Sequence, residues 1–199
     1  MINGIKSICF DIFGVLLRNK IQLNLLGKKR EHLPINENTV RNFWQSKGIA
    51  DFNKYRTNTL RGIILDVDYF DVIAMLSQNY HLGIISNTSE STFSTVNKFF
   101  GITRAFSPIL YSGKTDLSKP DHRIYEQYLD IVKLNPEQVL FIDDKIPNLA
   151  GAHQVGMKTF WVTQSKNAEN YYAKPESVYL PDFHGEGLRG LYLKLTSNK

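Results

Sequence analysis

The sequence is poor in cysteine and has no long apolar run, and both shortages restrict what the protein can be. Its 199 residues include one cysteine, Cys9, so no disulfide can form within the chain. Cys9 stands between Ile8 and Phe10, which is typical of a buried strand in a reducing compartment. No stretch of about 18 apolar residues occurs, and the first residues lack a signal-peptide layout. We therefore expect a cytoplasmic protein that does not span a membrane.

Acidic side chains are scarce in one part of the chain. The formal net charge is +5, and residues 18–61 carry ten Lys and Arg side chains against three acids, Glu31, Glu37 and Asp51. This excess favours a small anionic substrate near that segment. We do not expect nucleic acid as a partner, because no nucleic-acid-binding motif accompanies the basic residues.

Apolar residues make up 42% of the chain, which is enough for one sizeable core. Four apolar stretches end at polar residues and predict buried parallel strands, at residues 5–10, 82–85, 139–142 and 159–162. Helical patterns lie between them, at residues 89–100, 121–133 and 146–155. The alternation predicts an α/β fold with a doubly wound, Rossmann-like parallel sheet, in which ligands bind beyond the carboxyl ends of the strands.

The remaining segments break this rhythm. Residues 17–71 are basic and helix-prone without strand signals, and we expect a small helical cap inserted into the core. The core would then comprise residues 1–16 and 72–164. Residues 165–199 show no clear periodicity before Leu188, so we expect a tail that packs on the core without a catalytic role.

Polar side chains suited to chemistry follow the first two expected strands. Asp11 comes directly after the first strand, and Gly14 permits the tight backbone path that a ligand-binding loop needs. Ser86 and Asn87 follow the second strand just before a helix, where backbone N–H groups can bind phosphate oxygens. Taken singly, each feature also fits an ordinary turn or helix cap.

A lysine and a pair of acids complete the set. Lys119 precedes Pro120, which favours an extended backbone at the start of the next helix, where a fixed cation could neutralise a nucleophile and a phosphate. Asp143 and Asp144 are adjacent at a strand end, and their like charges repel unless a cation such as Mg²⁺ lies between them. A solvated lysine and a helix-capping Asp144 are the alternatives.

Together, these motifs resemble those of the haloacid dehalogenase (HAD) superfamily, in the manner of its subfamily IA. They are, in chain order, Asp11, Ser86, Lys119 and the pair Asp143 and Asp144. The resemblance extends over residues 5–163. Residues 148–152 and the Gly156-Met157 pair are also similar to that family's fourth motif. The insertion at 17–71 stands where the family's type-one helical cap belongs.

The resemblance implies a hydrolase in which Asp11 is a covalent nucleophile. It further implies a Mg²⁺ ion held by Asp11, the carbonyl of Phe13, and Asp143 or Asp144, with Asn148 assisting through water. The cofactor expected from the resemblance is therefore Mg²⁺.

The same resemblance assigns the substrate contacts. Ser86 and the Asn87 amide would hold the equatorial oxygens of a phosphate ester, and Lys119 would offset its repulsion from Asp11. Water would then hydrolyse the aspartyl-phosphate, while the cap would exclude bulk water and select a phosphorylated metabolite.

One position departs from the phosphatase pattern of the family. Where its phosphatases carry a second Asp that protonates the leaving group, this chain has Phe13, and a missing general acid costs about 10²–10⁴-fold in rate. An aromatic residue there is similar to the dehalogenase branch, which needs no metal, whereas the two acids at 143 and 144 favour a phosphatase. Three hypotheses follow: a magnesium-dependent phosphatase, a metal-free 2-haloacid dehalogenase, and a binding or regulatory protein with weak catalysis.

Overall fold

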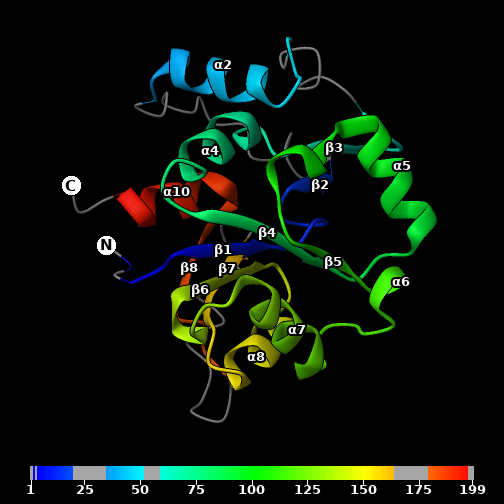
Figure 1. The fold of residues 1–199 in the computed structure, drawn as a ribbon, viewed down its shortest axis with the longest axis vertical. Coiled ribbons are helices and arrows are strands. Elements are labelled where there is room, and N and C mark those ends of the chain that lie inside the picture. Colours follow the sequence, from blue (N-terminus) through cyan, green and yellow to red (C-terminus); the bar gives the residue numbers. More distant parts are fainter. Residues whose placement is uncertain (1, 3, 20–34, 52–58, 164–178, 197–199) are drawn as a thin grey trace.

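The computed structural model describes residues 2, 4–19, 35–51, 59–163 and 179–196. Within them, six strands form one parallel sheet in the order β5-β4-β1-β6-β7-β8 (Figure 1). The strands are β1 (Ser7–Phe10), β4 (His81–Ser86), β5 (Ile109–Tyr111), β6 (Val139–Asp143), β7 (Lys158–Thr163) and β8 (Phe183–Glu186). This confirms the predicted α/β fold with a parallel sheet.

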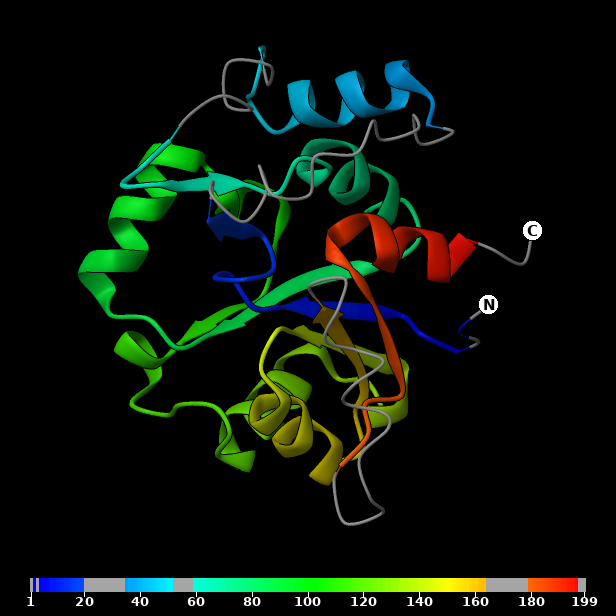
Figure 2. The ribbon, with the colours of Figure 1, turned by 180° about the vertical axis from the view of Figure 1, so that it is seen from behind.

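Helices cover both faces of the sheet (Figures 1 and 2). Helices α4 and α10 lie over one face, and α7 and α8 lie over the other. The bounds are α4 (Tyr69–Leu76), α5 (Glu90–Phe100), α6 (Ser112–Thr115), α7 (His122–Val132), α8 (Ile146–Gln154) and α10 (Gly187–Thr196). Helices α5, α7 and α8 are the three that the sequence predicts. Among the described residues, no helix combines the length and apolar character needed to cross a membrane.

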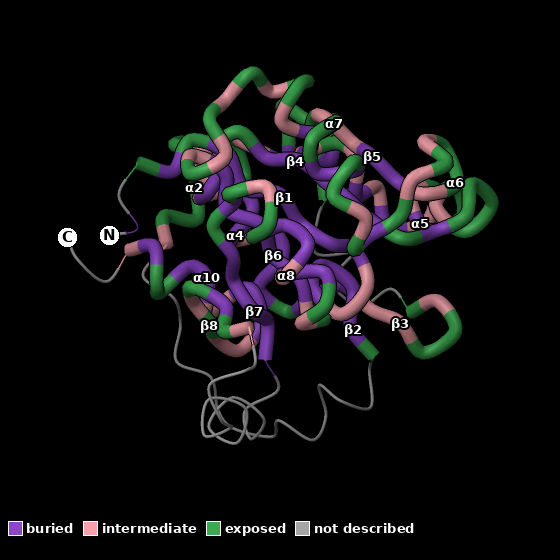
Figure 3. Tube along the Cα trace, turned by 90° about the horizontal axis from the view of Figure 1, so that it is seen from below, coloured by how far each residue is buried: buried purple, intermediate pink, exposed green. Residues whose placement is uncertain are grey.

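Alternate side chains of the central strands pack into two separate cores. On β1, Ile8 and Phe10 pack in one core, whereas Cys9 packs in the other. On β6, Ile142 joins the first core and Phe141 the second. Because both faces are covered, these strands are buried along their length (Figure 3). Burial on both faces explains why the sequence shows continuous apolar runs here instead of alternation.

Two strands of the sheet are absent from the sequence prediction. Strand β5 has only three residues, and β8 reads Phe-His-Gly-Glu, so neither forms an apolar run. Strand β8 lies in the expected tail, and it extends the sheet beside β7. Asp182, just before β8, accepts hydrogen bonds from the backbone N–H (2.9 Å) and hydroxyl (2.8 Å) of Thr159. The end of the chain therefore completes the core sheet.

The expected cap segment contains a helix and a small sheet. Strands β2 (Leu17–Asn19) and β3 (Ile63–Leu65) pair antiparallel, and α2 (Glu37–Ser46) lies between them in the sequence. The expectation of a segment without strands is wrong at these two places, because three-residue strands leave no periodic signal. Residues 20–34 and 52–58 of this segment lie outside the described residues, and the expected boundary at 71/72 falls inside α4.

Helix α2 is fastened to α4, as both ribbon views show (Figures 1 and 2). Trp44 of α2 is fully buried, its Nε1 donates a hydrogen bond of 2.8 Å to the carbonyl of Phe70, and its ring stacks on Tyr69. At the end of α2, Arg104 donates a hydrogen bond of 2.8 Å to the carbonyl of Gly48. These contacts make α2 part of the packed structure around α4.

The burial of Trp44 generates a stability prediction. Trp44→Ala should lower the free energy of unfolding by about 3–5 kcal/mol, because it leaves a cavity and removes a buried hydrogen bond. The matched control is Arg41→Ala, an exposed change on the same helix, which should stay within about 0.5 kcal/mol of wild type. Urea unfolding followed by circular dichroism measures both. Equal stabilities for the two variants would contradict the buried position of Trp44.

Candidate active site

The candidate site lies where three adjacent strands end. Strand β1 lies between β4 and β6, and Phe10 pairs in register with Ile84 and Ile142. Because the three strands run parallel, the residues that follow these positions reach the same edge of the sheet. Asp11, Ser86 and Asp143 come together for this reason.

Asp11 is almost fully buried and is held through one of its carboxylate oxygens. Oδ1 accepts hydrogen bonds from the backbone N–H of Ile12 (2.7 Å) and the hydroxyl of Ser86 (2.8 Å). The ammonium of Lys119 lies 3.0 Å from the same oxygen. These contacts fix the plane of the carboxylate, and a positioned carboxylate is the first requirement for a nucleophile.

Lys119 joins Asp11 to Asp143. Its Nζ lies 2.7 Å from Oδ2 of Asp143, and only 4% of the residue is exposed. Burial is the largest influence on the pKa of Lys119 and lowers it, but the charges of Asp11 and Asp143 outweigh burial, so the net pKa is raised. Lys119 is therefore a fixed positive charge between two carboxylates.

The side chain of Asn87 has a role other than the phosphate binding that the resemblance implies for the Asn87 backbone amide. Nδ2 donates a hydrogen bond of 2.8 Å to the carbonyl of Lys119, and Oδ1 accepts one of 2.8 Å from the Lys119 N–H. The sequence gives no sign of this pairing, because the two residues are 32 positions apart.

Asp143 is fully buried, and both of its oxygens are engaged. Oδ1 accepts a hydrogen bond from the backbone N–H of Lys145 (2.8 Å). Oδ2 receives the Lys119 ammonium and the Nδ2 of Asn148, at 2.7 and 3.0 Å. Asn148, expected to assist a metal through water, thus contacts Asp143 directly. Its own carbonyl accepts a hydrogen bond of 2.7 Å from the hydroxyl of Tyr125, which the sequence did not reveal.

Asp144 lies beside this pair with an unsatisfied oxygen. Its Oδ1 is buried and has no hydrogen-bond partner, although Trp161 Nε1 donates to its backbone carbonyl at 3.1 Å. Burial, followed by the charges of Asp143 and Asp11, raises the pKa of Asp144 to about 6. The carboxylate rests against Gly14, where a Cβ would lie 2.3 Å from Oδ2, so any larger residue would displace the Asp144 side chain. Gly14 also has a φ of 86°, which glycine adopts without strain.

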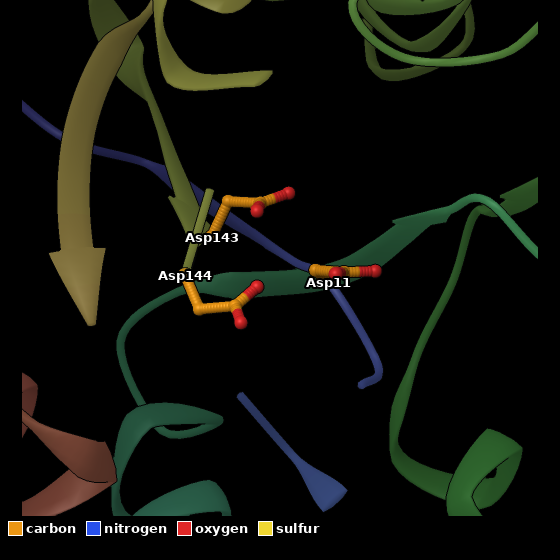
Figure 4. Close-up of side chains that lie close together, drawn as sticks. All are labelled: Asp11, Asp143 and Asp144. Atoms are coloured by element: carbon orange, nitrogen blue, oxygen red, sulfur yellow. The ribbon is translucent and has the colours of Figure 1, made fainter. Parts of the chain in front are cut away.

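Asp11, Asp143 and Asp144 form a candidate metal centre (Figure 4). One oxygen from each carboxylate lies within 4.8 Å of the others. A hard cation such as Mg²⁺ takes oxygen ligands, and it would satisfy the orphaned Asp144 oxygen and offset the like charges. The donor set therefore fits Mg²⁺. Asp144 has the open ligand atom, whereas the oxygens of Asp143 are occupied by protein donors.

Phe13, the departure from the phosphatase pattern, lies in the turn after Asp11. Its side chain is partly buried and packs against the core that contains Ile12. It offers neither a proton donor nor a base. The side chain at this position packs against the core, whereas its carbonyl is the ligand atom that the resemblance implies.

Comparisons with protein families and curated proteins agree with the family that the motifs resemble. The family model described as haloacid dehalogenase-like hydrolase matches residues 31–162. An (S)-2-haloacid dehalogenase of Pseudomonas sp. (strain YL) is 23% identical over 223 aligned positions, covering 94% of this chain and 93% of that protein. The phosphoserine phosphatase of Thermus thermophilus is 29% identical over 77 residues, covering 38% of this chain and 31% of that protein.

Solved structures share the fold of this chain. A dehalogenase with an intermediate complex superposes with a TM-score of 0.67 at 16% identity, and each chain is covered in full. The HAD-hydrolase YfnB of Bacillus subtilis, bound to magnesium, has a TM-score of 0.64 at 18% identity, with 98% of this chain and 100% of that chain covered. At such identities, the likeness establishes the fold. Because the family model spans well over half of the sequence, the chain belongs to the haloacid dehalogenase-like hydrolases.

Proposed function

We propose that the protein is a magnesium-dependent phosphatase that hydrolyses a small phosphorylated metabolite through an aspartyl-phosphate at Asp11. The observation that carries the proposal is the cluster of Asp11, Asp143 and Asp144 with the unpartnered Oδ1 of Asp144. A divalent cation would neutralise the excess negative charge of such a cluster. Phosphoryl transfer uses a divalent cation to offset the charge of the phosphate. The single buried cysteine suits a cytoplasmic enzyme.

The proposed metal ligands are Asp11, the carbonyl of Phe13, and Asp144. Asp143 supports them, because Lys119, Asn148 and the Lys145 N–H already use its oxygens. Bound there, Mg²⁺ would act as a Lewis acid on a phosphate oxygen.

The chain's own side chains would perform the chemistry. Asp11 attacks phosphorus, forming the Asp11–phosphorus bond as the bond to the leaving oxygen breaks. Lys119 lies 3.0 Å from Asp11 and reduces the repulsion between that carboxylate and the approaching phosphate. Ser86 orients Asp11 through its 2.8 Å hydrogen bond, and on substrate binding its one hydroxyl proton would be donated to a phosphate oxygen instead, beside the backbone amide of Asn87. Water then hydrolyses the acyl phosphate and restores Asp11.

Phe13 restricts the substrates that suit this proposal. Without a carboxylic acid at that position, the leaving oxygen departs with little protonation, which favours leaving groups of low pKa. An acyl phosphate or a sugar 1-phosphate meets this condition better than a simple alkyl phosphate.

A 2-haloacid dehalogenase is the second candidate function. Two observations favour it: the aromatic Phe13, and the alignment with an (S)-2-haloacid dehalogenase over 94% of the chain. Asp11 would displace halide, which needs no proton and no metal. The cluster of three carboxylates counts against it, since a haloacid carboxylate would add a further negative charge. A screen of phosphorylated metabolites and 2-haloacids, with and without Mg²⁺, separates the two, and failure of both substrate classes would favour a binding role.

Replacement of the proposed nucleophile is the first test. Asp11→Asn should reduce kcat on the order of 10⁴-fold, because an amide is a poor nucleophile, while the thermal melt stays close to that of wild type. Asp130→Asn, an exposed change on α7, is the matched control and should keep full activity. Near-normal turnover by folded Asp11→Asn would rule out the covalent mechanism.

Metal binding provides the second test, read by calorimetry. Asp144→Asn should weaken Mg²⁺ binding by about 100-fold or more, because loss of a direct ligand exceeds the 10–100-fold cost of losing a supporting residue. Without metal, the same variant should melt higher than wild type, because it removes a charge from a cluster of like charges. The control is the exposed Asp116→Asn.

Phosphatase activity should depend on Mg²⁺ binding. EDTA should suppress phosphatase turnover and spare any release of halide. Mg²⁺ binding of equal strength in Asp144→Asn and wild type would contradict the ligand assignment.

The third test concerns Phe13. Phe13→Asp should raise kcat on alkyl phosphates by about tenfold or more and change acyl-phosphate turnover little, because proton donation helps the most basic leaving group most. Folding must be checked by thermal melt, since the change removes partly buried aromatic surface. Phe13→Leu controls for lost aromatic packing. No gain on any alkyl phosphate by folded Phe13→Asp, together with metal-free halide release by wild type, would favour the dehalogenase.

A further inference from the structure

The amide side chain of Asn87 is paired with the backbone of a single distant residue. Nδ2 donates to the carbonyl of Lys119 and Oδ1 accepts from its N–H, both at 2.8 Å. The nitrogen of the amide donates and its oxygen accepts, and both hydrogen bonds go to the backbone of the same residue. The amide can therefore adopt only one orientation. Aspartate has the same shape but no donor, and alanine has neither group.

The backbone around Lys119 depends on such help. Lys119 lies in the loop between α6 and α7, outside any helix or strand, and the next residue, Pro120, has no N–H. Peptide groups without a partner in secondary structure need one elsewhere. The two hydrogen bonds with Asn87 supply it, because the Lys119 N–H donates one and the Lys119 carbonyl accepts the other.

The position of this backbone determines where the Lys119 ammonium lies. Nζ is 3.0 Å from Asp11 and 2.7 Å from Asp143, at the end of a long side chain that is almost wholly buried. A displacement of about 1 Å in a catalytic group can cost on the order of 10²-fold in rate. The backbone of the loop must therefore be held accurately, because it determines the position of the ammonium.

Asn87 also follows a residue that holds the nucleophile. Ser86 donates its hydroxyl proton to Oδ1 of Asp11, while Asn87 binds the backbone of Lys119. Two consecutive residues at the end of β4 thus set the nucleophile and the cation relative to each other.

We infer that the Asn87 side chain is a positioning residue, which acts on the reaction through Lys119 without touching the substrate. The inference deepens the proposed function and rests on it, because Lys119 is taken as the cation that assists attack by Asp11.

A double-mutant cycle tests the inference. Asn87→Asp and Asn87→Ala are made in wild type and in Lys119→Met, and kcat and KM are measured with acetyl phosphate and Mg²⁺. In wild type, both variants should lose about 10–100-fold in kcat, with KM within about threefold. In Lys119→Met, the same changes should cost less than about threefold, because the group they position is gone. Equal losses in the two backgrounds would overturn the inference, as would unchanged kcat in wild type.

A structural control separates positioning from stability. Asn97 on α5 also makes two hydrogen bonds to one residue through its side chain, and it accepts both, from the N–H (3.1 Å) and hydroxyl (2.8 Å) of Thr103. Asn97→Ala should lower the melting temperature by an amount similar to Asn87→Ala and leave kcat unchanged. A fall in kcat that follows melting temperature in both variants would reduce Asn87 to a structural role and overturn the inference.

Two readouts keep the inference testable whatever the enzyme hydrolyses. If wild type fails on every phosphate ester but releases halide from (S)-2-chloropropionate, the proposed function fails, and the same cycle is measured on halide release. Hydrogen exchange needs no turnover. The Lys119 amide should exchange at least tenfold faster in Asn87→Ala and Asn87→Asp than in wild type and Asn97→Ala. Unchanged exchange would overturn the inference even if the phosphatase assignment holds.

Discussion

The repulsion among three buried or half-buried carboxylates is the constraint on which the site depends. Asp11, Asp143 and Asp144 converge within a few ångströms, and Lys119 is the cation placed between the first two. One ammonium leaves two negative charges in excess when all three are ionised, an excess that one Mg²⁺ ion would neutralise. Partial protonation is the metal-free alternative, consistent with the pKa of about 6 at Asp144. The surrounding structure holds the three carboxylates close together despite their repulsion.

The parallel sheet makes such crowding possible. With β1 between β4 and β6, the ends of three strands deliver a carboxylate, a hydroxyl and a second carboxylate to one edge. Both faces of these strands are buried in separate cores, so the strand ends cannot spread apart to reduce repulsion without disturbing packing on both sides. The packing of two hydrophobic cores thus keeps together the carboxylates that would otherwise move apart.

The parts of this arrangement that could be predicted from the sequence are those encoded locally. Asp11 and Asp143 follow apolar runs that are buried on both faces, and these runs are unmistakable. Strands β2, β3, β5 and β8 have three or four residues each and acquire their structure from neighbours, so no periodicity identifies them. The pairing of Asn87 with Lys119 and the contact of Gly14 with Asp144 were also beyond prediction. They join residues far apart in the chain and depend on distances that only the fold determines.

The same charge balance helps to distinguish the two candidate reactions, hydrolysis of a haloacid and hydrolysis of a phosphate ester. A haloacid would bring one negative charge to a cluster in which three carboxylates already outnumber the single ammonium of Lys119. In the proposed phosphatase, a phosphate ester would bind together with Mg²⁺, so that the added charges would largely cancel and the Asp144 oxygen would bind the cation. Phe13 does not alter this balance, because it removes a proton donor and leaves the proposed metal ligands intact. Under the proposed function, the aromatic residue would restrict which leaving groups suit the enzyme, whereas the three carboxylates favour a phosphate ester as the substrate.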